Sequence, residues 1–327
     1  MTTDDRGALD GALVSQLTDL LAIQYGLTLR RLEAAPRGWT GETFVATDSS
    51  GWRCFVKAYR PDRLPPDAIA ALSVLHEMHR RGFRRATRPI ATTAGTLRAA
   101  WRDRVVVLFD YIDGTPTTSF DAAEVGRLVA EVHDLTTALT TPIVRETFAS
   151  PYAADLQRVL ADVSAAAERD EITHGLRTFV IERRDEHERD WATFDEVRAR
   201  CQAAAFDLVV THGDVQWNVM AGADGTLSLV DWDELLLAPA ERDTWSFDDR
   251  PAFAAAYHAT RANGAMPGGP SRELATRFYV FERYFSEVLG FATAILGDAP
   301  PARRAEALAL LDGEWMEGLR ARMHAPE

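Results

Sequence analysis

The sharpest constraint on the fold of this chain is a change of pattern near Gly114. Between residues 27 and 112, short runs rich in β-branched and aromatic residues alternate with turn signals such as the one at residues 48–51. After Gly114, apolar residues recur at helical spacing through most of the chain. This change predicts a small antiparallel β-sheet with one helix, followed by a large and mainly helical part.

The expected elements follow from these signals. Strands are expected at residues 27–34, 42–47, 52–59, 88–92, 104–111, 206–211 and 226–230. Helices are expected at residues 9–25, 67–81, 121–139, 151–169, 172–184 and 191–205, and within 241–322. The fold class is therefore α+β, and the segment Asp113-Gly114-Thr115-Pro116 is the expected hinge between the two parts.

Charge and composition narrow the partners of the chain. The formal net charge of the 327 residues is -13, which disfavours nucleic acid and anionic membranes and favours cationic or neutral partners. Two cysteines give no disulfide framework, and no run approaches the roughly 20 apolar residues of a membrane span. We therefore expect a soluble, cytoplasmic protein, either a monomer or a homodimer.

The residues with the clearest chemistry lie between positions 212 and 233. The segment opens with His212-Gly213-Asp214, reaches Asn218, crosses a glycine-rich turn, and closes with Val230-Asp231-Trp232-Asp233. Two carboxylates and an amide at the ends of two short strands form a cluster of hard oxygen ligands, which suits Mg²⁺. Phosphoryl transfer needs such a metal, together with an acceptor for the proton of the substrate hydroxyl.

A second signal is Lys57, the only lysine of the chain, in the strand-like run Cys54-Phe55-Val56-Lys57-Ala58-Tyr59. A lysine flanked by apolar residues on a strand can reach phosphate oxygens as a point charge. All other strongly basic side chains are arginine, which indicates that this position requires a lysine.

The segment from Val210 to Glu234, continued by Leu237-Ala238-Pro239 and Glu241-Arg242-Asp243, resembles the catalytic region of the aminoglycoside phosphotransferase and choline kinase superfamily. It is most similar to the spectinomycin phosphotransferase branch. The resemblance implies a protein-kinase-like fold of two lobes, with residues 1–112 binding nucleotide and residues 113–327 carrying the catalytic loop and the acceptor site. It also implies ATP or GTP and Mg²⁺ as cofactors, with a small-molecule hydroxyl as phosphate acceptor.

The resemblance gives roles to single residues of the catalytic segment. Asp214 matches the catalytic base, and Asp231 and Asn218 match the two metal ligands. His212 matches a structural brace of the loop, and Asp243 matches a buried aspartate that anchors the catalytic loop from the helix behind it.

The same resemblance assigns the nucleotide site. Lys57 matches the lysine that binds the phosphates. The acidic partner that this lysine normally takes from a helix is missing at the expected positions, so Asp67 is the candidate and Glu77 the alternative. The remaining expected contacts are the phosphate-covering loop with Gly38 and Gly41, and the backbones of Asp110 and Ile112 at the purine.

The acceptor site is expected in the helical part, where acidic side chains suit a cationic acceptor. The candidates are Asp233, Glu234, Glu282 and Glu287. The aromatic run 278–285 is expected to be a core stripe of a helix rather than a pocket wall.

One departure from the family keeps several functions open. The family places the amide five positions after the base, whereas Asn218 follows Asp214 by four, so either a tighter turn restores its position or metal binding is altered. The first hypothesis is a kinase of aminoglycoside or aminocyclitol antibiotics, and hence antibiotic resistance. The second is a kinase of another small molecule, or of a peptide, in a biosynthetic pathway. The third is a nucleotide-binding pseudokinase, which the short loop and the missing helix glutamate support.

Overall fold

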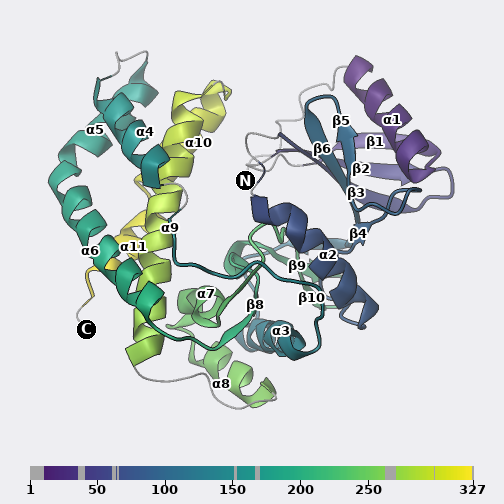
Figure 1. Cartoon of the computed structure of the whole chain (residues 1–327). Helices are drawn as coiled ribbons and strands as arrows, with labels where there is room; N and C mark the ends of the chain where they lie inside the picture. Colours follow the sequence, from purple (N-terminus) through teal and green to yellow (C-terminus); the bar gives the residue numbers. More distant parts are fainter. Residues whose placement is uncertain are drawn as a thin grey trace. The chain divides into compact units, whose positions relative to one another are not determined.

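The computed structural model describes residues 11–35, 41–60, 64, 66–150, 153–165, 170–261, 270–297 and 299–325 (Figure 1). The chain divides into two compact units. The first unit comprises Met1–Arg145, Val209–Ala238 and Ser246–Gly264, and the second comprises Glu146–Leu208, Pro239–Trp245 and Ala265–Glu327. The expected lobes, residues 1–112 and 113–327, divide the chain at a different place, and that division stays a prediction.

The first unit contains the expected antiparallel sheet, in the order β1-β2-β3-β6-β4, with β5 paired to β6. Its strands are β1 (Leu29–Ala34), β2 (Gly41–Asp48), β3 (Arg53–Tyr59), β4 (Pro89–Ile90), β5 (Ala99–Trp101) and β6 (Arg104–Asp110). Every pairing in this sheet is antiparallel. Among the strands of this sheet in the described residues, only the short strand β5 was not predicted from the sequence pattern.

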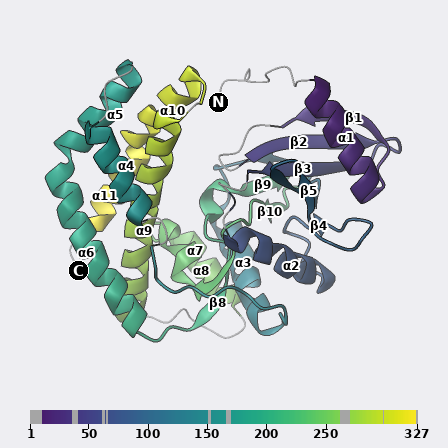
Figure 2. The same cartoon turned by 45° about the horizontal axis from the view of Figure 1, so that its top comes forward.

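Two helices accompany the sheet, α1 (Gly11–Tyr25) and α2 (Pro66–Arg80). Leu17 and Leu21 of α1 are fully buried in one apolar cluster with Phe44 of β2, Val56 of β3 and Leu108 of β6. Phe44 pairs directly with Val56, and Val56 with Leu108, so these side chains share one face of the sheet. The sheet face that α1 covers in Figures 1 and 2 is therefore the apolar core of this region.

The expected hinge segment is a strand in the structure. β7 (Gly114–Pro116) pairs with β9 (Val219–Gly222), which pairs in turn with β10 (Leu227–Leu229). A Cβ atom at Gly114 would lie 2.8 Å from the carbonyl oxygen of Ala221, so only glycine allows this close approach. The segment after the first sheet is thus fixed to the hairpin that lies between the predicted site residues Asn218 and Asp231.

Two helices of the first unit approach each other closely at a glycine. α3 (Ala122–Asp134) packs on α8 (Pro251–Thr260), and a Cβ atom at Gly126 would lie 2.5 Å from the Phe253 carbonyl oxygen. His133 of α3 and the Tyr257 hydroxyl of α8 form a buried hydrogen bond of 2.7 Å. This helix pair lies beside the hairpin, because α3 also contacts β10.

The second unit is helical and is built around α9 (Pro270–Leu296), which the surrounding helices flank in both views (Figures 1 and 2). The other helices are α4 (Ala153–Ala165), α5 (Glu171–Glu182), α6 (Arg184–Ala203), α7 (Glu241–Thr244), α10 (Pro301–Leu311) and α11 (Glu314–Met323). Phe278, Phe281 and Phe285 of α9 are buried in its core. This confirms the aromatic run as a core stripe, and the α+β class is confirmed as well. Over the described ranges, none of the helices is both long enough and apolar enough to span a bilayer.

Candidate active site

The predicted catalytic segment, residues 212–233, begins directly after strand β8 (Leu208–Thr211), which pairs with β11 (Leu236–Pro239). A 3₁₀ turn over Val215–Trp217 follows, closed by the Asn218 amide, which donates to the Val215 carbonyl at 3.1 Å. A 3₁₀ turn is tighter than an α-turn. The loop that is one residue short therefore still returns to its start, and the Asn218 side-chain Nδ2 donates to the carbonyl and Oδ2 of Asp214 at 2.8 and 3.0 Å.

His212 ties the two halves of this segment together. Its imidazole is fully buried, Nε2 lies 2.8 Å from the Val230 carbonyl oxygen, and Nδ1 accepts the Asp214 amide at 3.1 Å. With the ring proton on Nε2, this nitrogen donates to the Val230 carbonyl and Nδ1 accepts from the Asp214 amide, so both contacts are hydrogen bonds. The ring packs against Trp232 with centroids 4.6 Å apart. His212 thus contacts both the loop of Asp214 and the strand end before Asp231.

Asp231 is held in an unusual backbone conformation. Its φ is +59°, in the left-handed region that non-glycine residues rarely adopt, and such strain is concentrated at functional sites. The preceding Val230 donates its amide to the Asn218 carbonyl at 3.0 Å. This bond places Asp231 next to the loop from Asp214 to Asn218. The Asp231 side chain is 45% exposed, so its carboxylate remains accessible to solvent.

Lys57 lies at the same place, although it precedes the segment by more than 150 residues. Its Nζ contacts Asp231 Oδ1 and Asp233 Oδ2, each at 2.6 Å, and its side chain is only 6% exposed. Two positions further along β3, the Tyr59 hydroxyl donates to Asp233 Oδ1 at 2.7 Å. The lysine predicted for the phosphates and the aspartate predicted for the metal are therefore direct neighbours.

The electrostatics of this group reflect its burial. Burial raises the pKa of Asp233, and this effect outweighs Lys57 and Tyr59, which both favour the charged carboxylate. Burial alone would lower the pKa of Lys57, but the two carboxylates outweigh it and raise that pKa above its usual value. Burial also raises the pKa of Tyr59 far above its usual value, so this hydroxyl stays a donor.

The structure corrects the expected partner of Lys57. Neither Asp67 nor Glu77 pairs with it, and its ion pairs within the described residues are those with Asp231 and Asp233. Glu77 is engaged elsewhere: it accepts the backbone amides of Thr140 and Thr141 at 3.0 and 2.7 Å, and Arg81 lies 2.7 Å away. Hydrogen bonds from Thr141, with those from Arg81 and Thr140, hold the pKa of Glu77 well below its usual range.

The other expected nucleotide contacts are placed as follows. Gly41 is the first residue of β2, and Gly38 lies outside the described residues. The Asp110 amide donates to the Arg88 carbonyl at 2.9 Å, and the Asp110 carboxylate pairs with the Arg88 guanidinium at 2.8 Å. The Ile112 amide makes no backbone hydrogen bond to another described residue. Of these two amides, that of Ile112 is the one without a backbone partner in the described part of the chain, and the purine contacts expected of both backbones stay predictions.

The acceptor candidates come from both compact units. Asp233 belongs to the Lys57 cluster, and Glu234 is exposed one residue further on. Glu282 and Glu287 are half-buried on α9 of the second unit. Asp243 is buried on α7, also in the second unit. The roles expected for Glu234, Glu282, Glu287 and Asp243 stay predictions.

The sequence analysis did not predict that Asp233 and Tyr59 would lie together with Lys57. A sequence signal for it exists, because Tyr59 follows Lys57 by two positions and Asp233 follows Asp231 by two positions. Residues two apart on a strand face the same side, so Tyr59 had to accompany Lys57. The contact between the pair on β3 and the pair of aspartates depends on tertiary packing, which a local sequence pattern does not predict.

The fold is shared with kinases of small molecules. Spectinomycin phosphotransferase in complex with ADP and spectinomycin is 17% identical, with 95% of this chain and 94% of that chain covered and a TM-score of 0.69. An aminoglycoside phosphotransferase from Alicyclobacillus acidocaldarius is 18% identical, with 98% of each chain covered and a TM-score of 0.55. The choline kinase of Streptococcus pneumoniae is 11% identical, with 95% and 100% covered and a TM-score of 0.58.

At these identities the solved structures establish the kinase-like fold and nothing finer. No curated protein matches the chain. The sequence model of the phosphotransferase enzyme family matches residues 31–273, which include Lys57, the catalytic segment and most of both compact units. With the kinase-like fold and this match, the chain belongs to the phosphotransferase enzyme family, whose members transfer a phosphoryl group to a hydroxyl of a small molecule.

Proposed function

We propose that this protein uses ATP or GTP with Mg²⁺ to phosphorylate a hydroxyl of an aminoglycoside or aminocyclitol antibiotic. The observation that carries the proposal is the group of Lys57, Asp231, Asn218 and Asp214, joined by direct contacts through Asp231 and the backbone of Val230. These residue types supply a cation for phosphates, oxygen ligands for a metal and a proton acceptor, which are the parts that phosphoryl transfer needs.

Lys57 is the residue for the nucleotide phosphates. Its charge is now balanced by Asp231 and Asp233, so phosphate oxygens would replace one carboxylate while the other keeps the buried ammonium paired. The open amide of Ile112 supplies a backbone donor for the purine. Solved relatives with ADP or a non-hydrolysable ATP analogue support a nucleotide at such a site.

The donor set fits Mg²⁺, which takes one or two carboxylates and keeps several waters. Only Oδ1 of the half-exposed Asp231 carboxylate contacts Lys57, which leaves Oδ2 available. The Asn218 side chain uses its nitrogen on Asp214, which leaves Oδ1 without a hydrogen bond inside the described part of the chain. Asp231 and Asn218 would therefore hold the metal, and a bound Mg²⁺ would neutralise charge on the phosphates.

Asp214 is the residue for the acceptor hydroxyl. The Asn218 Nδ2 and the backbone tie to His212 orient its carboxylate, and it lies half-buried at the end of β8. A carboxylate fixed in this way can take the proton of the hydroxyl as that oxygen attacks phosphorus. Trp217, in the same turn and 49% exposed, offers an aromatic face for a sugar ring or a cation.

The proposed class of acceptor is supported by the net charge of the chain and by its similarity in fold to a solved kinase. The net charge of -13 favours a cationic acceptor, and the exposed Glu234 lies next to the Lys57 cluster. Spectinomycin phosphotransferase has a TM-score of 0.69, higher than those of the aminoglycoside phosphotransferase, 0.55, and the choline kinase, 0.58. Choline and macrolides, the acceptors named for other proteins of this fold, are the alternative outcomes of the same test.

The test is nucleotide turnover with Mg²⁺ against a panel of aminoglycosides, aminocyclitols including spectinomycin, choline and a macrolide. We expect one antibiotic of the first two classes to stimulate turnover and to gain one phosphate, detected by mass spectrometry. Phosphorylation of choline or the macrolide alone would overturn the acceptor class. Nucleotide binding without transfer to any member would favour a peptide or biosynthetic acceptor.

A further inference from the structure

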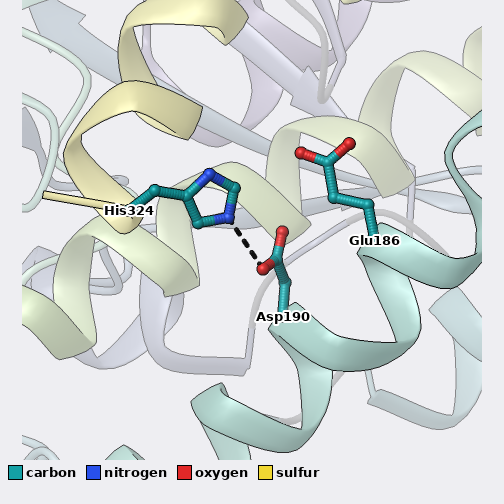
Figure 3. A group of neighbouring side chains, drawn as sticks. All are labelled: Glu186, Asp190 and His324. Carbon is teal, nitrogen blue, oxygen red and sulfur yellow. Dashed lines mark hydrogen bonds and ion pairs between the residues drawn. The ribbon is translucent and has the colours of Figure 1, made fainter.

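A second cluster of ionisable side chains lies in the helical unit, apart from the proposed catalytic residues in sequence and in compact unit. Figure 3 shows Glu186 and Asp190 on α6 and His324 just beyond the end of α11. Glu186 and Asp190 are four residues apart on one helix and therefore share a face. One oxygen or nitrogen atom from each of the three side chains lies within 4.8 Å of the other two.

Asp190 gives the observation that points to a ligand. Its side chain is only 9% exposed, and its Oδ1 is 2.9 Å from His324 Nε2. Its Oδ2 is closed to solvent and has no hydrogen-bond partner among the described residues. In Figure 3 this second oxygen points toward the space between the three side chains. A buried carboxylate oxygen without a partner is unfavourable by about 1–3 kcal/mol or more, so a cation there would be stabilising.

Glu186 is fixed in position by Arg320. The guanidinium donates to Oε1 through Nη2 at 2.6 Å and Nε at 3.1 Å, and to Oε2 through Nη2 at 2.8 Å. Carboxylates that bind metals are commonly oriented by such outer hydrogen bonds. Oε1 accepts two N–H groups, whereas Oε2 accepts one and retains a lone pair for a ligand. Two carboxylates, one guanidinium and a neutral imidazole leave one net negative charge, so the cluster can accept a divalent cation.

The ligand types select the cation. One imidazole nitrogen and two carboxylate oxygens suit Zn²⁺, whereas Mg²⁺ prefers an all-oxygen set. The His324 side chain is 47% exposed, which gives a cation access from solvent. We propose that Glu186, Asp190 and His324 bind a Zn²⁺ ion that links α6 to the end of α11, with a fourth position left to water.

The test is titration of the metal-free full chain with ZnCl₂, followed by calorimetry and thermal unfolding. We expect the wild type to bind one ion and to unfold at a higher temperature with zinc. His324→Gln and Glu186→Gln should each weaken zinc binding by about tenfold or more and remove most of the zinc-dependent rise. His324 is half-exposed and follows its helix, so His324→Gln should fold without zinc as the wild type does.

Two controls make the assignment specific. His174→Gln replaces an exposed histidine of α5 in the same unit and should leave zinc binding unchanged. Asp231→Asn, in the first unit, should also retain this zinc, which separates it from any metal held by the catalytic residues. An equal zinc response in the wild type and His324→Gln would overturn the proposal. So would the absence of zinc binding by the wild type, which would leave Asp190 and His324 as an ion pair only.

Discussion

The side chains of Glu77 and Asp233, both in the first unit, are only 10% and 14% exposed, yet their pKa values are shifted in opposite directions. Glu77 accepts hydrogen bonds from the backbone and side chains around Thr140 and Thr141 and pairs with Arg81, so its charged form is stabilised. Asp233 has Tyr59 and one lysine, which it shares with Asp231, and there burial outweighs the partners.

We infer from this difference that Glu77 is a structural carboxylate and that Asp233 belongs to a functional site. The contacts of Glu77 join α2 to the segment after α3 and need no ligand to be complete. The Lys57 group holds two carboxylates around one ammonium, and Asp231 adds an unfavourable φ of +59°. Such an arrangement is unfavourable for stability and is retained where a ligand completes it.

Asp231→Asn should nearly abolish activity and leave the fold intact. A bound metal contributes several kcal/mol to transition-state stabilisation, so we expect a fall in kcat/KM of about 10³-fold or more. Asparagine tolerates a positive φ, so the melting temperature should not fall. Steady-state turnover and thermal unfolding check both parts, and turnover close to that of the wild type would exclude Asp231 as the metal ligand.

Lys57→Met should weaken nucleotide binding and destabilise the first unit. Loss of charged hydrogen bonds of about 1.5–3 kcal/mol predicts a rise in the nucleotide Kd of about tenfold to a hundredfold. Two carboxylates would lose their partner, which is unfavourable by about 3–5 kcal/mol.

Nucleotide titration and denaturant unfolding measure these two effects. Tyr59→Phe is the matched control, because it removes a donor to Asp233 and leaves the ammonium in place. An unchanged nucleotide Kd in Lys57→Met would show that the lysine is only a structural cation.

Much of this site could be predicted from the sequence. The only lysine, the aspartate before Trp232 and the His212-Gly213-Asp214 turn are local signals, and the structure brings all three together. The partner of Lys57 could not be predicted, because its contacts with Asp231 and Asp233 span 174 and 176 residues of sequence. The pairing of the expected hinge as β7 depends likewise on Ala221, more than 100 positions away.

Glu77→Gln should lower stability and leave the chemistry unchanged. The pKa of Glu77 is lowered in the folded state, so Glu77 stabilises the folded protein when the pH is above the pKa of the unfolded state, about 4.3. This stabilisation is lost as the pH falls below that value. The variant should therefore show a lower melting temperature and a shallower loss of stability between about pH 5 and 3.

Asp67→Asn replaces the other carboxylate of α2, which has no ion pair within the described part of the chain, and serves as the control. It should match the wild type in melting temperature and pH dependence. A reduced turnover in Glu77→Gln at full stability would move Glu77 into the catalytic group.

Asp233→Asn should have the smallest effect on stability. The asparagine oxygen still accepts from Tyr59 or Lys57, and the burial penalty of one charge is removed, so we expect a change within about 1 kcal/mol of wild type. Because the pKa of Asp233 is raised in the folded state, its contribution to the free energy of unfolding falls as the pH rises above about 3.9. This pH dependence is opposite in sign to that of Glu77. Denaturant unfolding at several pH values measures the slope, and a large loss of stability would place Asp233 with Glu77 as a structural residue.

The most direct test of the account is to compare the wild type with Asp214→Ala in two assays on the same preparations. One assay measures nucleotide binding, and the other measures Mg²⁺-dependent phosphate transfer to the acceptor identified by the panel. We predict an unchanged nucleotide Kd and a loss of transfer of about 10²–10⁴-fold, the usual contribution of a general base. Transfer at the wild-type rate in Asp214→Ala would contradict the assignment of this segment as the phosphotransferase site.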